Sequence, residues 1–308
     1  MAGKILVIRG GAIGDFILTL PVFTALRSHL PQASLHVLGY ANVAQLAVAG
    51  GLVDKVRPIE SRALAGFFAR NGTLTQELQD YFASFAVIIS YLYDPDEFFQ
   101  SNVARCSKAQ FIVGPHRPDD RAGIHASEVF LKPLERLAVF NADPVSRLTL
   151  AHRPSPIASS LALHPGSGSE RKNWPEQKWA ELLERLVAAS DARLLLVGGE
   201  AEGDRLERLA SRLPPHRVEV ARNLPLTELS RRLMACAAFV GHDSGITHLA
   251  AALGIPGMAL WGETVREVWA PRNPNLEILA HESGLAGLET DTVFTALEKL
   301  RRSTLAAG

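Results

Sequence analysis

Short apolar runs alternate with longer amphipathic stretches along the whole chain. The apolar runs are continuous rather than alternating, which is typical of parallel strands that are covered on both faces. They read KILVIR, SLHVLG, DKVRPI, FAVIIS and QFIVG in the first half, and LALH, ARLLLVG, HRVEV, AFVGH and GMALWG in the second. The stretches between them predict helices over residues 15–30 and 125–140 in the first half, and at about 175–190, 201–213, 226–236 and 245–253 in the second.

The repetition of this pattern predicts two domains. Around residues 151–160 the chain reads AHRPSPIASS, a proline-containing polar segment that is typical of a linker. We therefore predict an α/β protein with two Rossmann-like, doubly wound domains, residues 1–154 and 155–308, facing each other across a cleft. The last amphipathic stretch, DTVFTALEKLRR, is expected to be a helix that closes the second domain or crosses back to the first.

Composition narrows the class of protein. Of the 308 residues, 47% are hydrophobic and 21% are charged, which indicates a globular chain with a substantial core. The formal net charge is zero, so a general attraction to nucleic acid is not expected. The two cysteines, Cys106 and Cys236, have no partner at metal-ligand spacing and indicate thiols in a reducing compartment. With no signal peptide and no apolar run near the ~20 residues of a membrane span, a cytoplasmic location is expected.

The first strand runs into a glycine cluster, GGAIG, that ends at Asp15. A dinucleotide fingerprint would need G-x-G-x-x-G and an acidic residue at the end of the second strand. Arg9 occupies the first glycine position and the second strand ends VLGYAN, so an NAD-linked oxidoreductase is not favoured. Open α/β sheets bind ligands at the carboxyl ends of their strands, where this turn places Asp15. Asp15 is therefore either a functional carboxylate or an ordinary helix cap, worth about 0.5–2 kcal/mol.

The second half opens with LALHPGSGSERKNWPEQKW, a strand, a Gly/Ser-rich loop and a helix that Pro175 begins. Such a loop can turn backbone N–H groups and the Ser167 hydroxyl toward phosphate oxygens, with Lys172 as a point charge. It is not a Walker loop, because G-x-x-x-x-G-K-[ST] is absent. A polar connection with a solvated lysine is an equal alternative.

A later strand end reads FVGHDSGITHLAAALGIP. The D-S-G turn at residues 243–245 exposes the N-terminus of a small-residue helix, where backbone N–H groups can hold a diphosphate. His242 and His248 have no third ligand at metal spacing, so we expect a structural role for His242 and a hydrogen-bonding role for His248.

Glu200 and Glu202 follow the strand LLLVGG near the same edge. A carboxylate there can accept hydrogen bonds from a ribose diol. The alternative is that the helix dipole favours acidic residues at this position.

Four segments, IRGGAIGDFILTLPVFTAL, LHPGSGSERKNWPEQKW, LVGGEAEGD and FVGHDSGITHLAAALGIP, occur in this order. Together they make the chain resemble the ADP-heptose:lipopolysaccharide heptosyltransferases, glycosyltransferase family 9, over nearly its whole length. The resemblance implies a GT-B fold, in which the C-terminal domain binds a nucleotide sugar and the N-terminal domain binds the acceptor.

The resemblance also implies an inverting transfer of a heptose from an ADP-sugar, with Asp15 as the general base that takes the acceptor proton. Lys172 and a helix N-terminus would stabilise the leaving ADP, so no metal or other cofactor is expected. Leu224 would pack on the adenine and Glu202 would hold the ribose. The full set implied for the donor is Ser167, Lys172, Glu202, Leu224, Asp243, Ser244, Gly245 and His248.

On the acceptor side, the turn that ends at Gly14 would clear room for a hydroxyl beside Asp15. Basic residues in the same half either meet an anionic acceptor or form a solvated face; they are Arg9, Arg57, Arg62, Arg117 and Arg121. The segment ISYLYDPDEFFQSN departs from the polar DxQG-like segment of many family members, so the acceptor stays open between a lipopolysaccharide core, another anionic glycan and an unrelated molecule. A lipid-linked acceptor would bring the protein to the inner face of the membrane.

Two alternatives remain open from sequence. Asp94 and Asp96 form a D-x-D, which binds a divalent metal in the other large glycosyltransferase fold. The second alternative is a GT-B-like epimerase or a protein that binds a nucleotide sugar without transferring it. The presence of Asp15 in the expected turn favours transfer.

Overall fold

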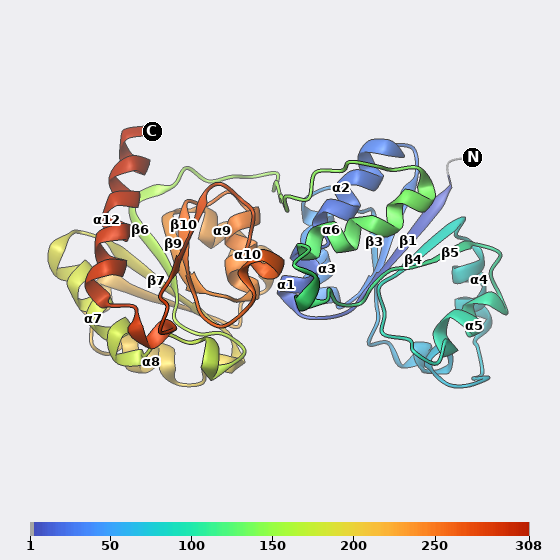
Figure 1. The fold of residues 1–308 in the computed structure, drawn as a ribbon, viewed down its shortest axis with the longest axis horizontal. Coiled ribbons are helices and arrows are strands. Elements are labelled where there is room, and N and C mark those ends of the chain that lie inside the picture. Colours follow the sequence, from blue (N-terminus) through green and yellow to red (C-terminus); the bar gives the residue numbers. More distant parts are fainter. Residues whose placement is uncertain (1–2, 308) are drawn as a thin grey trace. The chain divides into compact units, whose positions relative to one another are not determined.

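A computed structural model describes residues 3–307 of the chain (Figure 1). The chain divides into two compact units, Met1–Pro144 and Val145–Gly308. The boundary expected from the proline-containing segment lies later, at 154/155. Residues 145–154 belong to the second unit. They are hydrogen-bonded there, because the Leu148 amide donates to the Ala252 carbonyl oxygen at 2.8 Å.

The first unit is built on a sheet of parallel strands in the order β3-β2-β1-β4-β5. Four of the strand sequences begin or end at the predicted residues, because buried parallel strands give continuous apolar runs. Their bounds are β1 (Lys4–Arg9), β2 (Ser34–Gly39), β3 (Lys55–Pro58), β4 (Val87–Ser90) and β5 (Gln110–Val113).

Helices cover both faces of this sheet, with α2, α3 and α6 on one face and α4 and α5 on the other (Figure 1). Prolines split the two long helices that the sequence predicts. Pro21 has no amide hydrogen to continue a helix from α1 into α2, and Pro133 ends α6 in the same way. The helical bounds are α1 (Ile13–Ile17), α2 (Leu20–His29), α3 (Ala41–Ala49), η1 (Arg62–Phe68), α4 (Gln76–Ala83), α5 (Phe98–Ala104), η2 (Asp120–Ala122), α6 (Ala126–Leu131) and η3 (Lys132–Leu137).

The second unit has a parallel sheet in the order β11-β10-β9-β6-β7-β8. The sequence pattern misses its edge strand β11, because LEILA is half-exposed and carries Glu277, so it does not form an apolar run. The strands are β6 (Ile157–His164), β7 (Arg193–Gly198), β8 (Val218–Arg222), β9 (Cys236–His242), β10 (Gly257–Trp261) and β11 (Leu276–Ala280).

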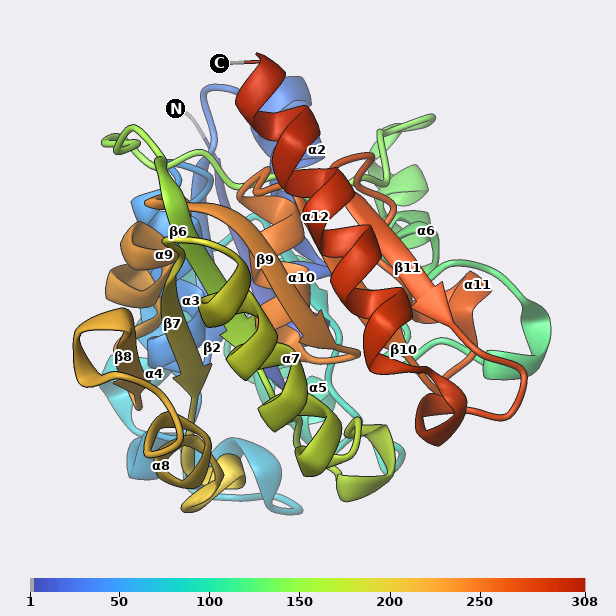
Figure 2. The same ribbon diagram turned by 90° about the vertical axis from the view of Figure 1, so that its left-hand side faces the viewer.

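The last helix, α12, belongs to the second unit. It packs against α7 and against strands β9 and β10, and Figure 2 shows α7 and α12 together on one face of the sheet. Val293 and Leu297 of α12 are buried in the core of this unit, so the helix closes the second unit. The helical bounds are η4 (Glu170–Lys172), α7 (Glu176–Ala189), η5 (Glu200–Glu202), α8 (Arg205–Ala210), η6 (Pro215–Arg217), α9 (Leu226–Met234), α10 (Gly245–Ala252), α11 (Arg266–Trp269), η7 (Leu285–Gly287) and α12 (Thr290–Ala307).

Each sheet reverses its strand order once, between β1 and β4 in the first unit and between β6 and β9 in the second. Such a switch point opens a crevice at the carboxyl ends of the strands, which is where ligands bind in open α/β sheets. The glycine turn before Asp15, the loop that contains Lys172 and the D-S-G turn all follow these strands. Within residues 3–307, no helix combines the length and the apolar character that crossing a membrane requires.

Candidate active site

Asp15 lies in the first turn of α1, directly after β1. Its Oδ2 accepts a hydrogen bond from the Ala12 amide at 3.0 Å, so it does cap the helix, yet its side chain remains 30% exposed. Gly11 has φ +101°, and a Cβ built there would lie 2.8 Å from Asp15 Oδ2. A glycine is therefore needed at this position both for the backbone conformation and to leave room for the carboxylate.

Arg9 ends β1 and lies beneath this carboxylate. Its Nη2 is 3.7 Å from Asp15 Oδ1, while Nη1 donates to the His116 carbonyl oxygen at 2.9 Å. The guanidinium carbon lies 4.3 Å from the centroid of the Phe130 ring. Burial lowers the pKa of Arg9, and the charge of Asp15 opposes this shift. With 2% of its side chain exposed, Arg9 is placed to hold Asp15 rather than to meet an acceptor directly.

The other acceptor-side candidates lie in the same unit with more exposure. Gly14 is the second residue of α1 and is half-buried. Arg62 begins η1 and Arg121 lies in η2, and both side chains are exposed. Arg57 is engaged elsewhere, because it pairs with Glu77 at 2.6 Å.

The D-x-D segment has a structural use in the fold. Asp94 caps α5, since its two carboxylate oxygens accept the amides of Phe99 and Gln100 at 3.2 and 3.0 Å. A metal-binding D-x-D needs both carboxylates turned toward a cation, and that of Asp94 is already used by the helix. This geometry does not favour the metal-dependent alternative.

In the second unit, Lys172 and Asp243 are brought together from positions far apart in the sequence. Lys172 Nζ donates to Asp243 Oδ2 at 2.6 Å. The Asp243 side chain is 7% exposed and the Lys172 side chain is 40% exposed, so the carboxylate is buried while the lysine side chain remains accessible. An ammonium group has three N–H donors, and only one is needed for this pair.

The N-terminus of α10 lies next to this pair. Ser244 is the N-cap, and its hydroxyl accepts the Thr247 amide at 3.3 Å. Gly241 lets the helix approach β9 closely, because a Cβ there would lie 2.8 Å from Thr247 Oγ1. The amide of Gly245 begins the helix, where N–H groups have no intrahelical partner and attract an anion.

His242 holds both ends of the loop between β6 and α7. Its Nε2 accepts the Trp174 amide at 2.8 Å and lies 3.2 Å from Trp179 Nε1, while Nδ1 is 3.2 Å from the Gly166 carbonyl oxygen. These contacts require a neutral imidazole that donates from Nδ1. Burial lowers the pKa of His242 to about 3. The predicted structural role of His242 is confirmed.

Ser167 faces into that loop. Its hydroxyl lies 2.8 Å from Asn173 Oδ1 and 2.8 Å from the Ser169 carbonyl oxygen, and the residue is 5% exposed. Arg205 supports the loop, because its Nη2 donates to both carboxylate oxygens of Glu170, to Oε2 at 2.8 Å and to Oε1 at 3.0 Å. Ser167 therefore shapes the loop that carries Lys172.

Glu202 is buried beneath the same loop. Its Oε2 accepts the amide of Gly199, and its side chain packs against Gly166 and Gly198, where any larger residue would collide with it. Burial lowers the pKa of the neighbouring His164. The expected ribose contact of Glu202 stays a prediction, since the carboxylate already stabilises the end of β7.

The remaining donor candidates lie at the same edge of the sheet or on α10. Leu224 is half-buried in the loop from β8 to α9, and the adjacent Asn223 amide donates to the Gly198 carbonyl oxygen at 3.0 Å. His248 is buried on α10, one turn after Ser244. Their contacts with a nucleotide sugar stay predictions.

Sequence reasoning missed the residues that organise these side chains. Trp174 and Trp179 flank the polar loop in NWPEQKW, and two tryptophans beside a Gly/Ser loop are a signal that could have been used. Arg205 gives no such signal, because its contacts depend on the packing of α8 against α7.

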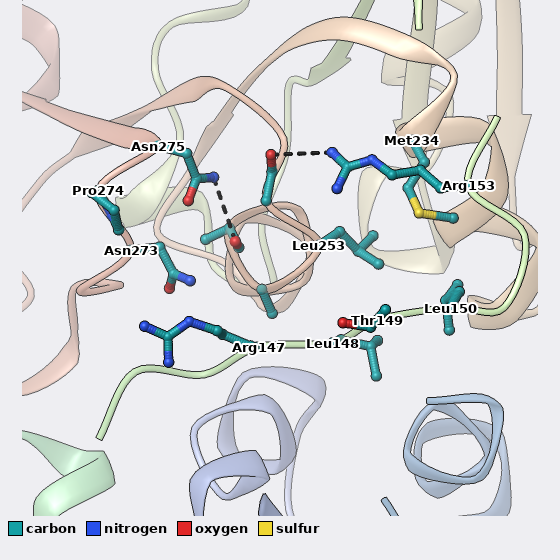
Figure 3. A pocket seen from close by; sticks show the side chains of 13 residues that line it. Arg147, Leu148, Thr149, Leu150, Arg153, Met234, Leu253, Asn273, Pro274 and Asn275 are labelled. Atoms are coloured by element: carbon teal, nitrogen blue, oxygen red, sulfur yellow. Dashed lines mark hydrogen bonds between the residues drawn. The ribbon is translucent and has the colours of Figure 1, made fainter. Parts of the chain in front are cut away.

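A separate cavity of about 290 Å³ lies at the opposite end of α10 (Figure 3). Arg153 Nη2 donates to the Gly254 carbonyl oxygen at 3.4 Å, and Asn275 Nδ2 donates to that of Ile255 at 2.7 Å. These side chains satisfy carbonyl groups at and just beyond the end of the helix. No predicted donor residue lines this cavity.

The sequence of this chain is similar to those of known glycosyltransferases. Residues 144–295 match the family described as glycosyltransferase family 9 (heptosyltransferase). The chain is 37% identical over 109 residues to lipopolysaccharide heptosyltransferase 1 of Pseudomonas aeruginosa, an alignment that covers 35% of this chain and 30% of that protein. It is 23% identical over 284 residues to lipopolysaccharide heptosyltransferase 1 of Escherichia coli O18:K1:H7, covering 85% of this chain and 86% of that protein.

A solved structure, that of the Escherichia coli ADP-heptose lipopolysaccharide heptosyltransferase II, superposes with a TM-score of 0.77 at 18% identity. The superposition covers 97% of this chain and 99% of that one. It confirms the GT-B fold class predicted from the sequence.

Proposed function

We propose that this chain, a glycosyltransferase that belongs to glycosyltransferase family 9, moves a heptose from an ADP-sugar to a lipopolysaccharide core or a related glycan. The second unit would bind the nucleotide sugar and the first unit would bind the acceptor. The relatives that are named lipopolysaccharide heptosyltransferases support both substrate classes. A glycolipid acceptor would bring the enzyme to the inner face of the membrane from the cytoplasm.

The accessible Lys172 side chain is the observation that carries the donor half of the proposal. It is held 2.6 Å from the buried Asp243 carboxylate, beside the N-terminus of α10. A cation next to exposed helix N–H groups matches a diphosphate in charge and in hydrogen-bonding donors. When the bond from the sugar to the diphosphate breaks, these groups stabilise the charge that develops on the leaving ADP.

Asp15 would act as the general base. The acceptor oxygen forms a bond to the anomeric carbon as the bond to the ADP oxygen breaks, ADP leaves with the electron pair, and Asp15 takes the hydroxyl proton. Attack from the side opposite the leaving group inverts the anomeric configuration. The half-exposed position of Asp15 and its support by Arg9 suit a base that must reach a bound hydroxyl.

We further propose that no metal takes part, because the cationic groups around Lys172 supply the charge that a metal would otherwise supply. Calorimetric titration with ADP, UDP and NAD, each with and without EDTA, tests the donor site. We expect selective ADP binding that EDTA does not change and that Asp15→Ala retains. Tight NAD binding would contradict the proposal, and UDP binding that EDTA abolishes would support the D-x-D alternative.

A transfer assay tests the reaction itself. Incubation with ADP-heptose and lipopolysaccharide that lacks heptose is expected to give a product whose anomeric configuration, read by NMR, is opposite to that of the donor. A protein that binds the ADP-sugar but neither releases ADP nor forms product would be a binding protein, and the proposed activity would then be wrong.

A further inference from the structure

We propose that Tyr93 and His116 form a subsite that binds a sugar ring of the acceptor. This inference rests on the proposed function, and it names two residues that neither the resemblance nor the motif analysis assigns. Tyr93 follows β4 and His116 follows β5, two strands that are neighbours in the sheet of the first unit. Both therefore lie at the carboxyl edge that also presents Asp15.

The Tyr93 ring is unusually exposed for an aromatic side chain. It is 72% exposed, more than Tyr40 and Phe68 at 44% or Phe140 at 57%. One side of the ring is supported by the His116 imidazole, with 4.7 Å between the centroids and 57° between the planes. Aromatic rings held in this way present an apolar face and a polar edge, which suits the mixed apolar and hydroxyl surface of a sugar.

The backbone on both sides of Tyr93 is anchored. Tyr91 is buried, and its hydroxyl donates to the Phe130 carbonyl oxygen at 2.6 Å. On the other side, Asp94 accepts the amides of Phe99 and Gln100. The backbone that carries the ring is consequently held in place before a ligand arrives, which reduces the entropy lost on binding.

Arg9 links this aromatic pair to the candidate base. One guanidinium contacts Asp15 through Nη2 and the His116 carbonyl oxygen through Nη1. The backbone that carries His116 and the carboxylate of Asp15 therefore lie on either side of a single buried side chain. In this proposal, a sugar ring bound on Tyr93 presents a hydroxyl toward Asp15, as proton transfer requires.

Calorimetric titration of deacylated, heptose-free lipopolysaccharide into the ADP-saturated protein tests the subsite without depending on transfer. We expect Tyr93→Ala to weaken binding of this probe by roughly three- to tenfold, the range of a single aromatic contact. Tyr93→Phe should bind as the wild type does, and His116→Ala should show a smaller loss, because only the support of the ring is removed. ADP affinity should be the same in all variants.

Phe140→Ala is the matched control, since it removes another exposed ring of the same unit. The subsite would be ruled out if Tyr93→Ala bound the probe as tightly as the wild type, if Phe140→Ala weakened binding equally, or if the wild type did not bind the probe. Probe binding that depends on Tyr93 together with no consumption of ADP-heptose would instead refute the proposed transfer and leave the subsite standing.

Discussion

In each unit an ion pair at the carboxyl edge of the sheet contains a candidate site residue, and the two pairs are opposite in arrangement. In the first unit the cation, Arg9, is 2% exposed and the carboxylate, Asp15, is 30% exposed. In the second unit the carboxylate, Asp243, is 7% exposed and the cation, Lys172, is 40% exposed. In each pair the outward member has the charge that its expected substrate needs, a base for a hydroxyl and a cation for a diphosphate. The buried member positions it.

Removing the outward carboxylate should have the largest effect. Asp15→Asn keeps the size of the side chain and an oxygen to cap α1, but it removes the proposed proton acceptor. We expect the transfer rate to fall by roughly 10²- to 10⁴-fold, the usual contribution of a general base. ADP affinity should not change, because the donor residues lie in the other unit. Loss of ADP binding in this variant would show that the two pairs are not independent.

Removing the outward cation should affect the donor instead. Lys172→Met leaves the Asp243 carboxylate without its partner, so ADP affinity should fall by roughly 10- to 100-fold, as expected when a charged hydrogen-bonding group is lost. The double variant Lys172→Met, Asp243→Asn removes the unpaired charge and is the matched control. If it binds ADP as weakly as the single variant, the ammonium group itself carries the affinity. Recovery of ADP binding in the double variant would assign the loss to the unpaired carboxylate.

The buried imidazole of His242 predicts a pH dependence that is specific to the second unit. Its pKa is about 3 in the folded protein and about 6.5 when unfolded, so the unfolded chain binds the extra proton between these values. The contribution of the neutral His242 imidazole to the free energy of unfolding is complete above pH 6.5 and is lost as the pH falls toward 3. The loss between pH 7 and pH 5 is about 2 kcal/mol.

Urea unfolding followed by tryptophan fluorescence measures this effect, because all four tryptophans lie in the second unit. His242→Gln should reduce the difference in stability between pH 7 and pH 5, while the exposed His216→Gln should not. Equal differences in His242→Gln and the wild type would contradict the assignment. Part of the dependence should remain in His242→Gln, because burial also lowers the pKa of His164.

The exposed arginines of the first unit should give the smallest effects. Arg62→Gln and Arg121→Gln each remove a charge from the surface, where single ionic contacts are worth about 0–1 kcal/mol. The KM for heptose-free lipopolysaccharide should rise by less than roughly fivefold, with kcat unchanged. A large loss of kcat would place one of these arginines at the reacting atoms.

Most of the fold could be predicted from the sequence because buried parallel strands leave a local signal. KILVIR and SLHVLG correspond to β1 and β2 over their whole length. The strand that was missed, β11, is half-exposed at the sheet edge and has no apolar run. The helices predicted over residues 15–30 and 125–140 were located correctly but drawn too long, since the apolar period continues past Pro21 and Pro133 while the backbone hydrogen bonds do not. Helices α3, α4 and α5 of the first unit were not predicted.

The sequence suggests the individual candidate residues, but it does not show the contacts between them. Asp15, Lys172 and Asp243 each follow a strand within a local motif. The contact of Arg9 with the His116 backbone, and that of Lys172 with Asp243, join segments that meet only after each sheet has formed. The hydrophobic period and the spacing of motifs along the chain do not show which distant side chains will meet at a switch point.

The positive charges of the first unit differ in how strongly salt screens them, because Arg9 is buried whereas Arg62 and Arg121 are exposed. Dissolved ions screen exposed charges over about 8 Å at physiological ionic strength, but they do not enter the interior where the Arg9 guanidinium contacts Phe130. Raising the salt concentration should therefore weaken long-range attraction of an anionic glycan to Arg62 and Arg121 and slow its arrival. The field that Arg9 exerts on Asp15 should change less, so the proposed proton transfer should depend on salt concentration less than the arrival of the acceptor does.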